Sequence, residues 1–92
     1  MEHGFIVYGR LKRGLSERSL EEIHRVMEGV KKAAQEYGIR VVMYGFPYGV
    51  AEDFVVVYES EKGLVNFYNF AVNTEFLYES PRTNQVAIPQ PG

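Results

Sequence analysis

Two strand-like segments lie next to each other in the middle of the chain, between two helical patterns, and this order constrains the fold more than any other feature. The two segments are Ile39–Tyr48 and Phe54–Glu59. Another strand pattern opens the chain at Phe5–Leu11, and a short one closes it at Asn84–Ile88. In chains with this order of elements, the helices gather on one face of the sheet. We therefore predict one α+β domain over residues 1–92, in which two helices cover one face of a four-stranded antiparallel sheet.

The first helix is predicted at Ser19–Tyr37, where the pattern is clearest. Ser19 and Glu22 have the spacing of a capping box, in which the serine hydroxyl accepts a hydrogen bond from the backbone three residues later. Apolar side chains then recur at steps of three and four, which is the period of one helical stripe. Gly38 follows, and we expect it to end the helix in the left-handed conformation that glycine adopts without strain.

The second helix is predicted from Leu64 to about Asn73. It could run on toward Tyr78, and Ser80-Pro81 is expected to end it, because proline cannot continue a helix. Residues 89–92, with the sequence Pro-Gln-Pro-Gly, are expected to form a loose tail.

Gly9 is an unusual residue for the interior of the first strand, because glycine weakens a strand. It indicates either a bulge or a position where a ligand or another backbone segment comes close. The strand is expected to end in a turn at residues 12–14, with the sequence Lys-Arg-Gly.

The composition disfavours several kinds of function. The chain has no cysteine and only two histidines, His3 and His24, so disulfides, thiolate metal sites and multi-histidine metal sites are not expected. A net charge of −2 offers no strongly basic surface for nucleic acid. The longest apolar run is far shorter than the ~20 residues of a membrane helix, and the acidic N-terminus is unlike a signal peptide. We expect a cytoplasmic protein with no metal, cofactor, membrane or nucleic-acid partner.

Neither face of the predicted sheet is polar. Alternate residues of a strand point to opposite faces, and both sets are mostly apolar or aromatic in the three strands at Phe5–Leu11, Ile39–Tyr48 and Phe54–Glu59. A face covered by water would carry alternating polar residues. Hydrophobic residues make up 46% of the chain, which is more than one small core needs. We therefore expect a homodimer, or a larger assembly, formed through the sheet face that the helices leave open.

The order of the elements, the chain length and the doubly apolar sheet resemble the dimeric α+β barrel superfamily, whose members are small ferredoxin-like chains. The resemblance extends over nearly the whole chain as a pattern, without a specific motif. It implies a ferredoxin-like β-α-β-β-α-β fold, a homodimer that pairs sheet to sheet, and one pocket per subunit. That pocket would lie between the sheet and its helices or inside the barrel. Members include cofactor-free monooxygenases, isomerases, dehydratases and haem enzymes, so the fold transfers no single function.

Tyrosines on the strands, with one arginine beside them, favour a pocket for an aromatic or acidic small molecule. Arg10 is expected to hold an anionic group, because an arginine among apolar strand residues is costly to bury unless it is paired. His24 borders the apolar stripe of the first helix and is a candidate general base near neutral pH. The predicted catalytic residues are His24, Tyr8 and Arg10, and the predicted ligand-binding residues are Tyr44, Tyr48 and Tyr58. The structural alternative is that the tyrosines only pack at the sheet rim or a dimer seam.

Two classes of function stay open. The first is a homo-oligomer that binds a small molecule, which in its catalytic form would be a cofactor-free oxygenase-like or isomerase-like enzyme. The second is a non-catalytic oligomeric protein or an ACT-like regulatory module, which binds a small amino acid near a glycine after the first strand, where Gly14 lies. RNA-recognition motifs share the topology, but Glu52 and Asp53 at the start of the third strand would repel phosphate.

Overall fold

The computed structural model describes residues 2–16 and 18–88, and it contains the expected elements in the expected order. The strands are β1 (Glu2–Leu11), β2 (Ile39–Gly45), β3 (Phe54–Ser60) and β4 (Tyr78–Ile88). The helices are α1 (Arg13–Ser16), α2 (Leu20–Glu36) and α3 (Leu64–Ala71), which the 3₁₀-helix η1 (Val72–Leu77) continues. The tail expected at residues 89–92 lies outside the described residues.

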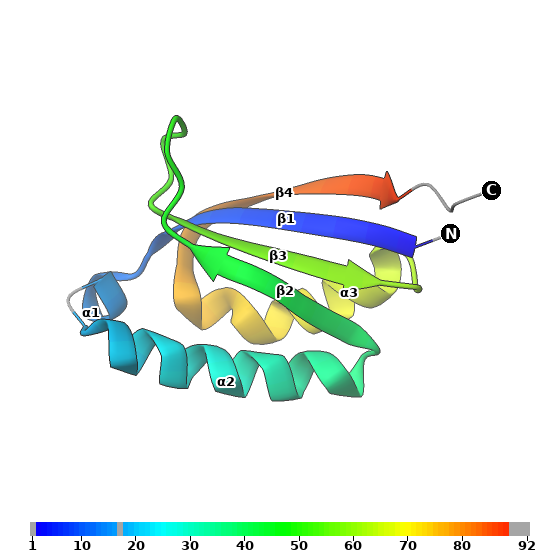
Figure 1. Ribbon diagram of the computed structural model, residues 1–92, viewed down its shortest axis with the longest axis horizontal. Helices are drawn as coiled ribbons and strands as arrows, with labels where there is room; N and C mark the ends of the chain where they lie inside the picture. Colours follow the sequence, from blue (N-terminus) through cyan, green and yellow to red (C-terminus); the bar gives the residue numbers. More distant parts are fainter. Residues whose placement is uncertain (1, 17, 89–92) are drawn as a thin grey trace.

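The strands form one antiparallel sheet in the order β2-β3-β1-β4, and helices α2 and α3 lie on one of its faces (Figure 1). This is the predicted ferredoxin-like α+β fold. The core fills the space between the sheet and these helices, and its largest fully buried side chains include Phe5, Phe54, Tyr58, Phe67 and Phe70. Phe5 stacks on Phe67 with 4.2 Å between the ring centroids, which joins β1 to α3.

Helix α2 begins and ends where the sequence predicts. The Ser19 hydroxyl accepts a hydrogen bond from the Glu22 backbone N–H at 3.3 Å, which satisfies a donor that the first helical turn leaves free. Gly38 follows the C-cap residue Tyr37 and has φ +70°, in the left-handed region. Asn66 Nδ2 donates to the Tyr37 carbonyl at 2.8 Å, so α3 helps to hold this end of α2.

The C-terminal strand differs most from the prediction. β4 begins at Tyr78 and not at Asn84. Ser80 and Pro81, which the sequence predicts to end a helix, lie inside β4 at a shift in its register with β1. A strand tolerates a proline and a residue with positive φ when it lies at the sheet edge and is bulged, and β4 meets both conditions.

The second helix is also more irregular than the pattern predicts. It is α-helical only to Ala71 and continues as the tighter helix η1. The Thr74 hydroxyl donates to the Ala71 carbonyl at 2.8 Å, a side-chain bond that competes with regular helix geometry. A short helix, α1, replaces the turn predicted at residues 12–14.

Strand β2 contains a β-bulge that simple alternation does not predict. Its register with β3 shifts between Val41 and Met43, which leaves Val42 as an extra residue. Beyond the bulge the pleat is reversed. Tyr44 therefore faces the helices together with Val41, whereas alternation predicts opposite faces for these two residues.

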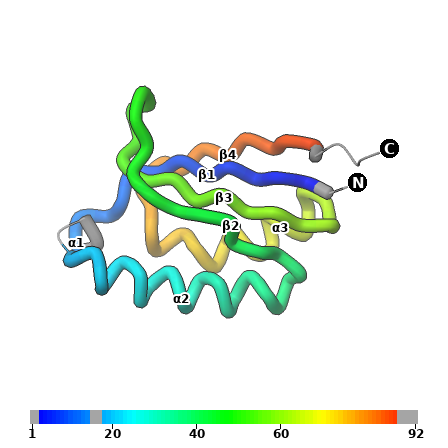
Figure 2. Tube along the Cα trace, in the orientation of Figure 1, coloured from blue at the N-terminus to red at the C-terminus, as the bar shows by residue number. Residues whose placement is uncertain are grey.

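The connection between β2 and β3, residues 46–53, projects from the sheet on the side away from the helices (Figures 1 and 2). β2 ends at Gly45 and not at the predicted Tyr48, because Pro47 has no N–H to donate to a strand ladder. Tyr48 is fully exposed in this connection.

The sheet face opposite the helices is mostly apolar, and we call it the open face. The strand register places on it Ile6, Tyr8, Met43, Val55, Val57 and Val86. All six are half-buried or exposed in the single chain. Two ion pairs also lie on this side of the sheet: Arg40–Glu59 at 2.9 Å joins β2 to β3, and Arg82–Glu52 joins β4 to the β2–β3 connection.

Candidate functional site

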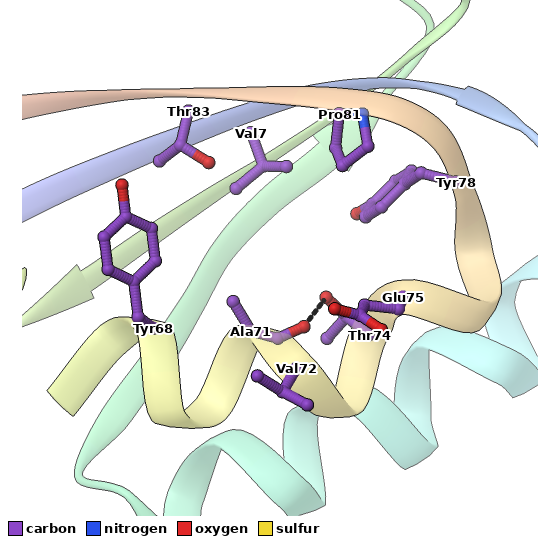
Figure 3. Close-up of a pocket in the computed structure, with 9 residues that line it drawn as sticks. All are labelled: Val7, Tyr68, Ala71, Val72, Thr74, Glu75, Tyr78, Pro81 and Thr83. Carbon is purple, nitrogen blue, oxygen red and sulfur yellow. Dashed lines mark hydrogen bonds between the residues drawn. The ribbon is translucent and has the colours of Figure 1, made fainter. Parts of the chain in front are cut away.

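A pocket of about 420 Å³ lies between the sheet and the helical segment α3–η1 (Figure 3). Val7 of β1 and Thr83 of β4 pair across the two strands and form its floor. The other lining residues come from α3, η1 and the start of β4, and they are Tyr68, Ala71, Val72, Thr74, Glu75, Tyr78 and Pro81. The volume lies in the range of small-molecule sites, which also combine apolar walls with a few polar groups.

Tyr78 contributes the most unusual polar group of the pocket. The residue is 4% exposed, and its hydroxyl points into the pocket (Figure 3). The oxygen is buried and has no described residue at hydrogen-bonding geometry. Leaving a buried hydroxyl without a partner costs ~1–3 kcal/mol, so an orphaned group in a native fold calls for an unseen partner such as water or a ligand.

Tyr78 lies beside a second buried tyrosine of the core. Burial raises the pKa of Tyr78 to about 12. Burial also raises the pKa of Tyr58 well above its usual value, and the nearby Tyr78 hydroxyl raises it further. The two hydroxyls are thus close enough to perturb each other, and the interaction with Tyr58 offsets part of the rise in the pKa of Tyr78. Near neutral pH both are uncharged phenols, so Tyr78 can offer a ligand a hydrogen bond without a charge.

Gly9 makes room for the Tyr78 ring. A Cβ atom at position 9 would lie 2.5 Å from Cδ1 and 2.7 Å from Cγ of this ring, closer than real Cβ atoms approach other atoms. The sequence predicts either a bulge or a close approach at Gly9. The structure has a close approach by a side chain, and the extra residue of the β1–β4 pairing belongs to β4.

The charge around the pocket is negative only. Among its nine described lining residues, Glu75 is the one acidic residue, and none is Lys, Arg or His. The Thr74 hydroxyl already donates to the Ala71 carbonyl. Tyr68, Tyr78 and Thr83 carry the remaining hydroxyls, so the pocket suits a molecule with an apolar body and few polar atoms.

The predicted tyrosines and His24 are distributed over the molecule and do not line this pocket. Tyr58 is buried in the core, where its ring packs edge-on against Phe67 and Phe70, each with 5.4 Å between centroids. The Tyr44 hydroxyl of β2 contacts Nδ1 of His24 on α2, and the two rings meet edge to face. That contact brings two predicted residues together at the surface.

Tyr8 and Arg10 lie on the other side of the sheet. The register shift between Tyr8 and Arg10 adds its extra residue to β4 and not to β1, so alternation along β1 places both side chains on the open face. The Arg82 guanidinium lies over the Tyr8 ring, with 4.3 Å between Cζ and the ring centroid, and it also hydrogen-bonds Glu52 at 3.2 Å. This hydrogen bonding lowers the pKa of Glu52 and raises the pKa of Arg82. Arg10 is exposed and lowers the pKa of Glu52 through its charge.

The sheet therefore separates His24 from Tyr8 and Arg10 within one chain. His24 projects from α2 on the helix side, whereas the other two lie on the open face. Alternation and periodicity in the sequence do not identify the residues that do line the pocket, such as Tyr78, Tyr68 and Glu75. Gly9 is the one sequence signal that points to Tyr78, because a glycine in a strand marks a close neighbour.

The described residues contain neither a metal-ligand cluster nor a membrane-spanning helix. In residues 2–16 and 18–88, no three His, Asp or Glu side chains lie together as metal ligands would. No helix within the same residues is long and apolar enough to cross a membrane.

No protein-family model matches the chain, and no curated protein is significantly similar to it in sequence. Solved structures do resemble it. A dimeric ferredoxin-like protein of unknown function from Thermobifida fusca matches with a TM-score of 0.56 and 17% identity, over 96% of this chain and 92% of that one. A dimeric protein of unknown function and ferredoxin-like fold from Bacteroides fragilis matches with a TM-score of 0.52 and 19% identity, over 95% of this chain and 96% of that one.

A NIPSNAP family protein with unknown function from Agrobacterium tumefaciens is also similar, with a TM-score of 0.52 and 15% identity over 94% of this chain and 86% of that one. At these identities the similarities establish the ferredoxin-like fold and nothing beyond it. The fold class predicted from the order of the elements is thereby confirmed.

Proposed function

We propose that this protein is a homo-oligomer that binds a small molecule in the pocket beside Tyr78. The observation that carries the proposal is the buried Tyr78 hydroxyl, which points into a cavity of about 420 Å³ without a well-aligned partner among the described residues. A ligand atom that bonded this hydroxyl would remove the cost of leaving it unpaired.

The open face supports the proposal of self-association. Ile6, Val55 and Val57 lie at its centre on the two middle strands, and an apolar sheet face of this kind is normally covered. In a two-fold dimer the same patch would meet its own copy. The Thermobifida and Bacteroides proteins of the same fold are described as dimeric. The pocket lies on the helix side of the sheet, so dimerisation and ligand binding would not compete.

Catalysis on the open face is a second candidate function. Tyr8, Arg10, Arg82 and Glu52 form a polar cluster there, in which Arg82 contacts both Tyr8 and Glu52. In a dimer that pairs sheet to sheet, this cluster would lie inside the assembly, where Arg10 could bind an anionic substrate. His24 would not belong to this site within the same chain. If the protein is instead a regulatory module, it would bind its ligand in the Tyr78 pocket without converting it. We also propose a cytoplasmic location, from the composition of the chain alone.

Native mass spectrometry of the purified protein tests the proposal. We expect a mass of two or more chains, with one additional small molecule bound to each chain. Thr83→Phe would fill the pocket from its floor with a ring that strands accept well, and it should abolish the additional mass without changing the oligomer. Gln85→Phe is the matched control, since it adds the same ring to the same face of β4 outside the pocket lining. Equal ligand loading in both variants would contradict the proposed site.

A further inference from the structure

We infer that the pocket takes an uncharged molecule with an apolar body and a carbonyl or hydroxyl oxygen that bonds Tyr78. This inference rests on the proposed function, since it names the ligand class for the same pocket. Three features of the lining residues support this inference. They are the apolar walls, the negative charge of Glu75 and the neutral hydroxyl of Tyr78.

The walls provide a surface for an apolar ligand body. Val7 lies on the sheet side, Ala71 and Val72 lie on the helix side, and Pro81 closes the pocket next to Tyr78 (Figure 3). Burial of apolar ligand surface against such side chains contributes ~25 cal/mol per Å². A strongly hydrated ligand would lose water against these walls without replacing its hydrogen bonds.

The electrostatics disfavour an anionic ligand. Glu75 is the one charged residue of the lining, and no cationic side chain is present among the described lining residues to compensate a second negative charge. Arg10, which the sequence predicts to hold an anion, belongs to the opposite face of the sheet. A cationic ligand gains little here, because Glu75 is exposed and water screens its charge.

The polar anchor is suited to a neutral oxygen. Burial holds Tyr78 in its protonated form, with a pKa of about 12, so its hydroxyl keeps a proton to donate. A carbonyl or hydroxyl oxygen accepts such a proton and needs no counter-charge. The ligand oxygen would then satisfy the one buried side-chain polar atom that lacks a partner in the part of the chain the structure describes.

Four probes that share one naphthalene ring test this inference by equilibrium dialysis. They are acetylnaphthalene, ethylnaphthalene, naphthoate and naphthylmethylammonium, all substituted at the same ring position. We expect acetylnaphthalene to bind roughly five- to tenfold more tightly than ethylnaphthalene, which has no oxygen to bond Tyr78, and more tightly than both ions.

Tyr78→Phe isolates the hydroxyl, because phenylalanine keeps the ring against Gly9. In this variant we expect acetylnaphthalene and ethylnaphthalene to bind equally. Tyr37→Phe is the control, since it removes a hydroxyl that contacts Asn73 outside the pocket lining, and it should leave all four affinities unchanged.

The outcomes separate the ligand class from the pocket itself. Tighter binding of naphthoate or naphthylmethylammonium than of acetylnaphthalene would overturn the ligand class and leave the pocket standing. A preference for acetylnaphthalene that survived Tyr78→Phe would remove Tyr78 as the anchor and overturn the inference as well. If none of the four probes bound, the inference would be wrong, and the small molecule seen or not seen by native mass spectrometry would decide the proposed function separately.

Discussion

The ring of Tyr78 rests on the β1 backbone at Gly9, with no space for a side chain between them. This contact directs the tyrosine hydroxyl, because it keeps the ring between the sheet and η1 with Oη toward the pocket (Figure 3). A larger residue at position 9 would push the ring toward the pocket or out of the core. The absence of one Cβ atom in β1 thus determines the polar anchor of the proposed site.

We expect Gly9→Ala to destabilise the protein by ~1–3 kcal/mol, the usual cost of forcing extra atoms into a packed core. It should also weaken the binding of acetylnaphthalene, because the hydroxyl would move. Urea unfolding and equilibrium dialysis measure the two effects. Gly29→Ala is the control, since Gly29 lies in α2 with nothing near its Cβ position, and alanine there should stabilise by ~0.5–1 kcal/mol. If Gly9→Ala left the free energy of unfolding unchanged, the Tyr78 ring would have to shift without an energetic cost.

Stability should fall at alkaline pH because of the buried tyrosines. Tyr78 titrates at about 12 in the folded chain, whereas a tyrosine in an unfolded chain titrates near 10. Between these values the unfolded state binds fewer protons, so the free energy of unfolding decreases as pH rises. The contribution of Tyr78 to the free energy of unfolding is intact below pH 10. It is lost toward pH 12, at about 1.4 kcal/mol per pH unit.

Urea unfolding at a series of pH values measures this slope. Tyr58 should add to it in the same direction, because burial raises its pKa too. Tyr78→Phe should flatten the decline, since phenylalanine does not titrate. Identical slopes for wild type and Tyr78→Phe would show that the Tyr78 phenol is not buried in solution.

Gly38 should tolerate few replacements. Its φ of +70° is left-handed, and a β-branched side chain is strained in that conformation. We expect Gly38→Val to lower the free energy of unfolding by ~1 kcal/mol or more, and Gly38→Asn to cost less, because asparagine enters this region more easily. Thermal melting compares the two variants. Equal melting temperatures for wild type and Gly38→Val would mean that α2 ends elsewhere.

The open face should hold two chains together. Val57 lies there between Ile6 and Met43, so Val57→Glu would bury a carboxylate in the proposed interface at a high desolvation cost. Sedimentation at micromolar concentration should find at least two chains for wild type and one for Val57→Glu. Val65→Glu, at a 76% exposed position of α3, should leave the assembly intact. A monomeric wild-type protein would rule out this interface.

The sequence by itself determined the fold, because its main signals are local. The stripe of α2, its cap at Ser19 and its end at Gly38 depend on neighbouring residues, and they predict the helix closely. The order of strands and helices then leaves a ferredoxin-like sheet as the arrangement in which both helices pack their apolar stripes on one face of the sheet. The apolar character of the open face was visible in the same way, from alternation alone.

Only the tertiary structure decided where the pocket lies and which residues line it. The bulges at Val42 and at Ser80–Pro81 arise from pairing between strands that are distant in sequence, and each shifts the register on which alternation depends. Tyr78 lies beside Gly9 because β4 pairs with β1, a contact that no local pattern encodes. A binding site made of such contacts depends on distances across the chain, and these exist only once the core has packed.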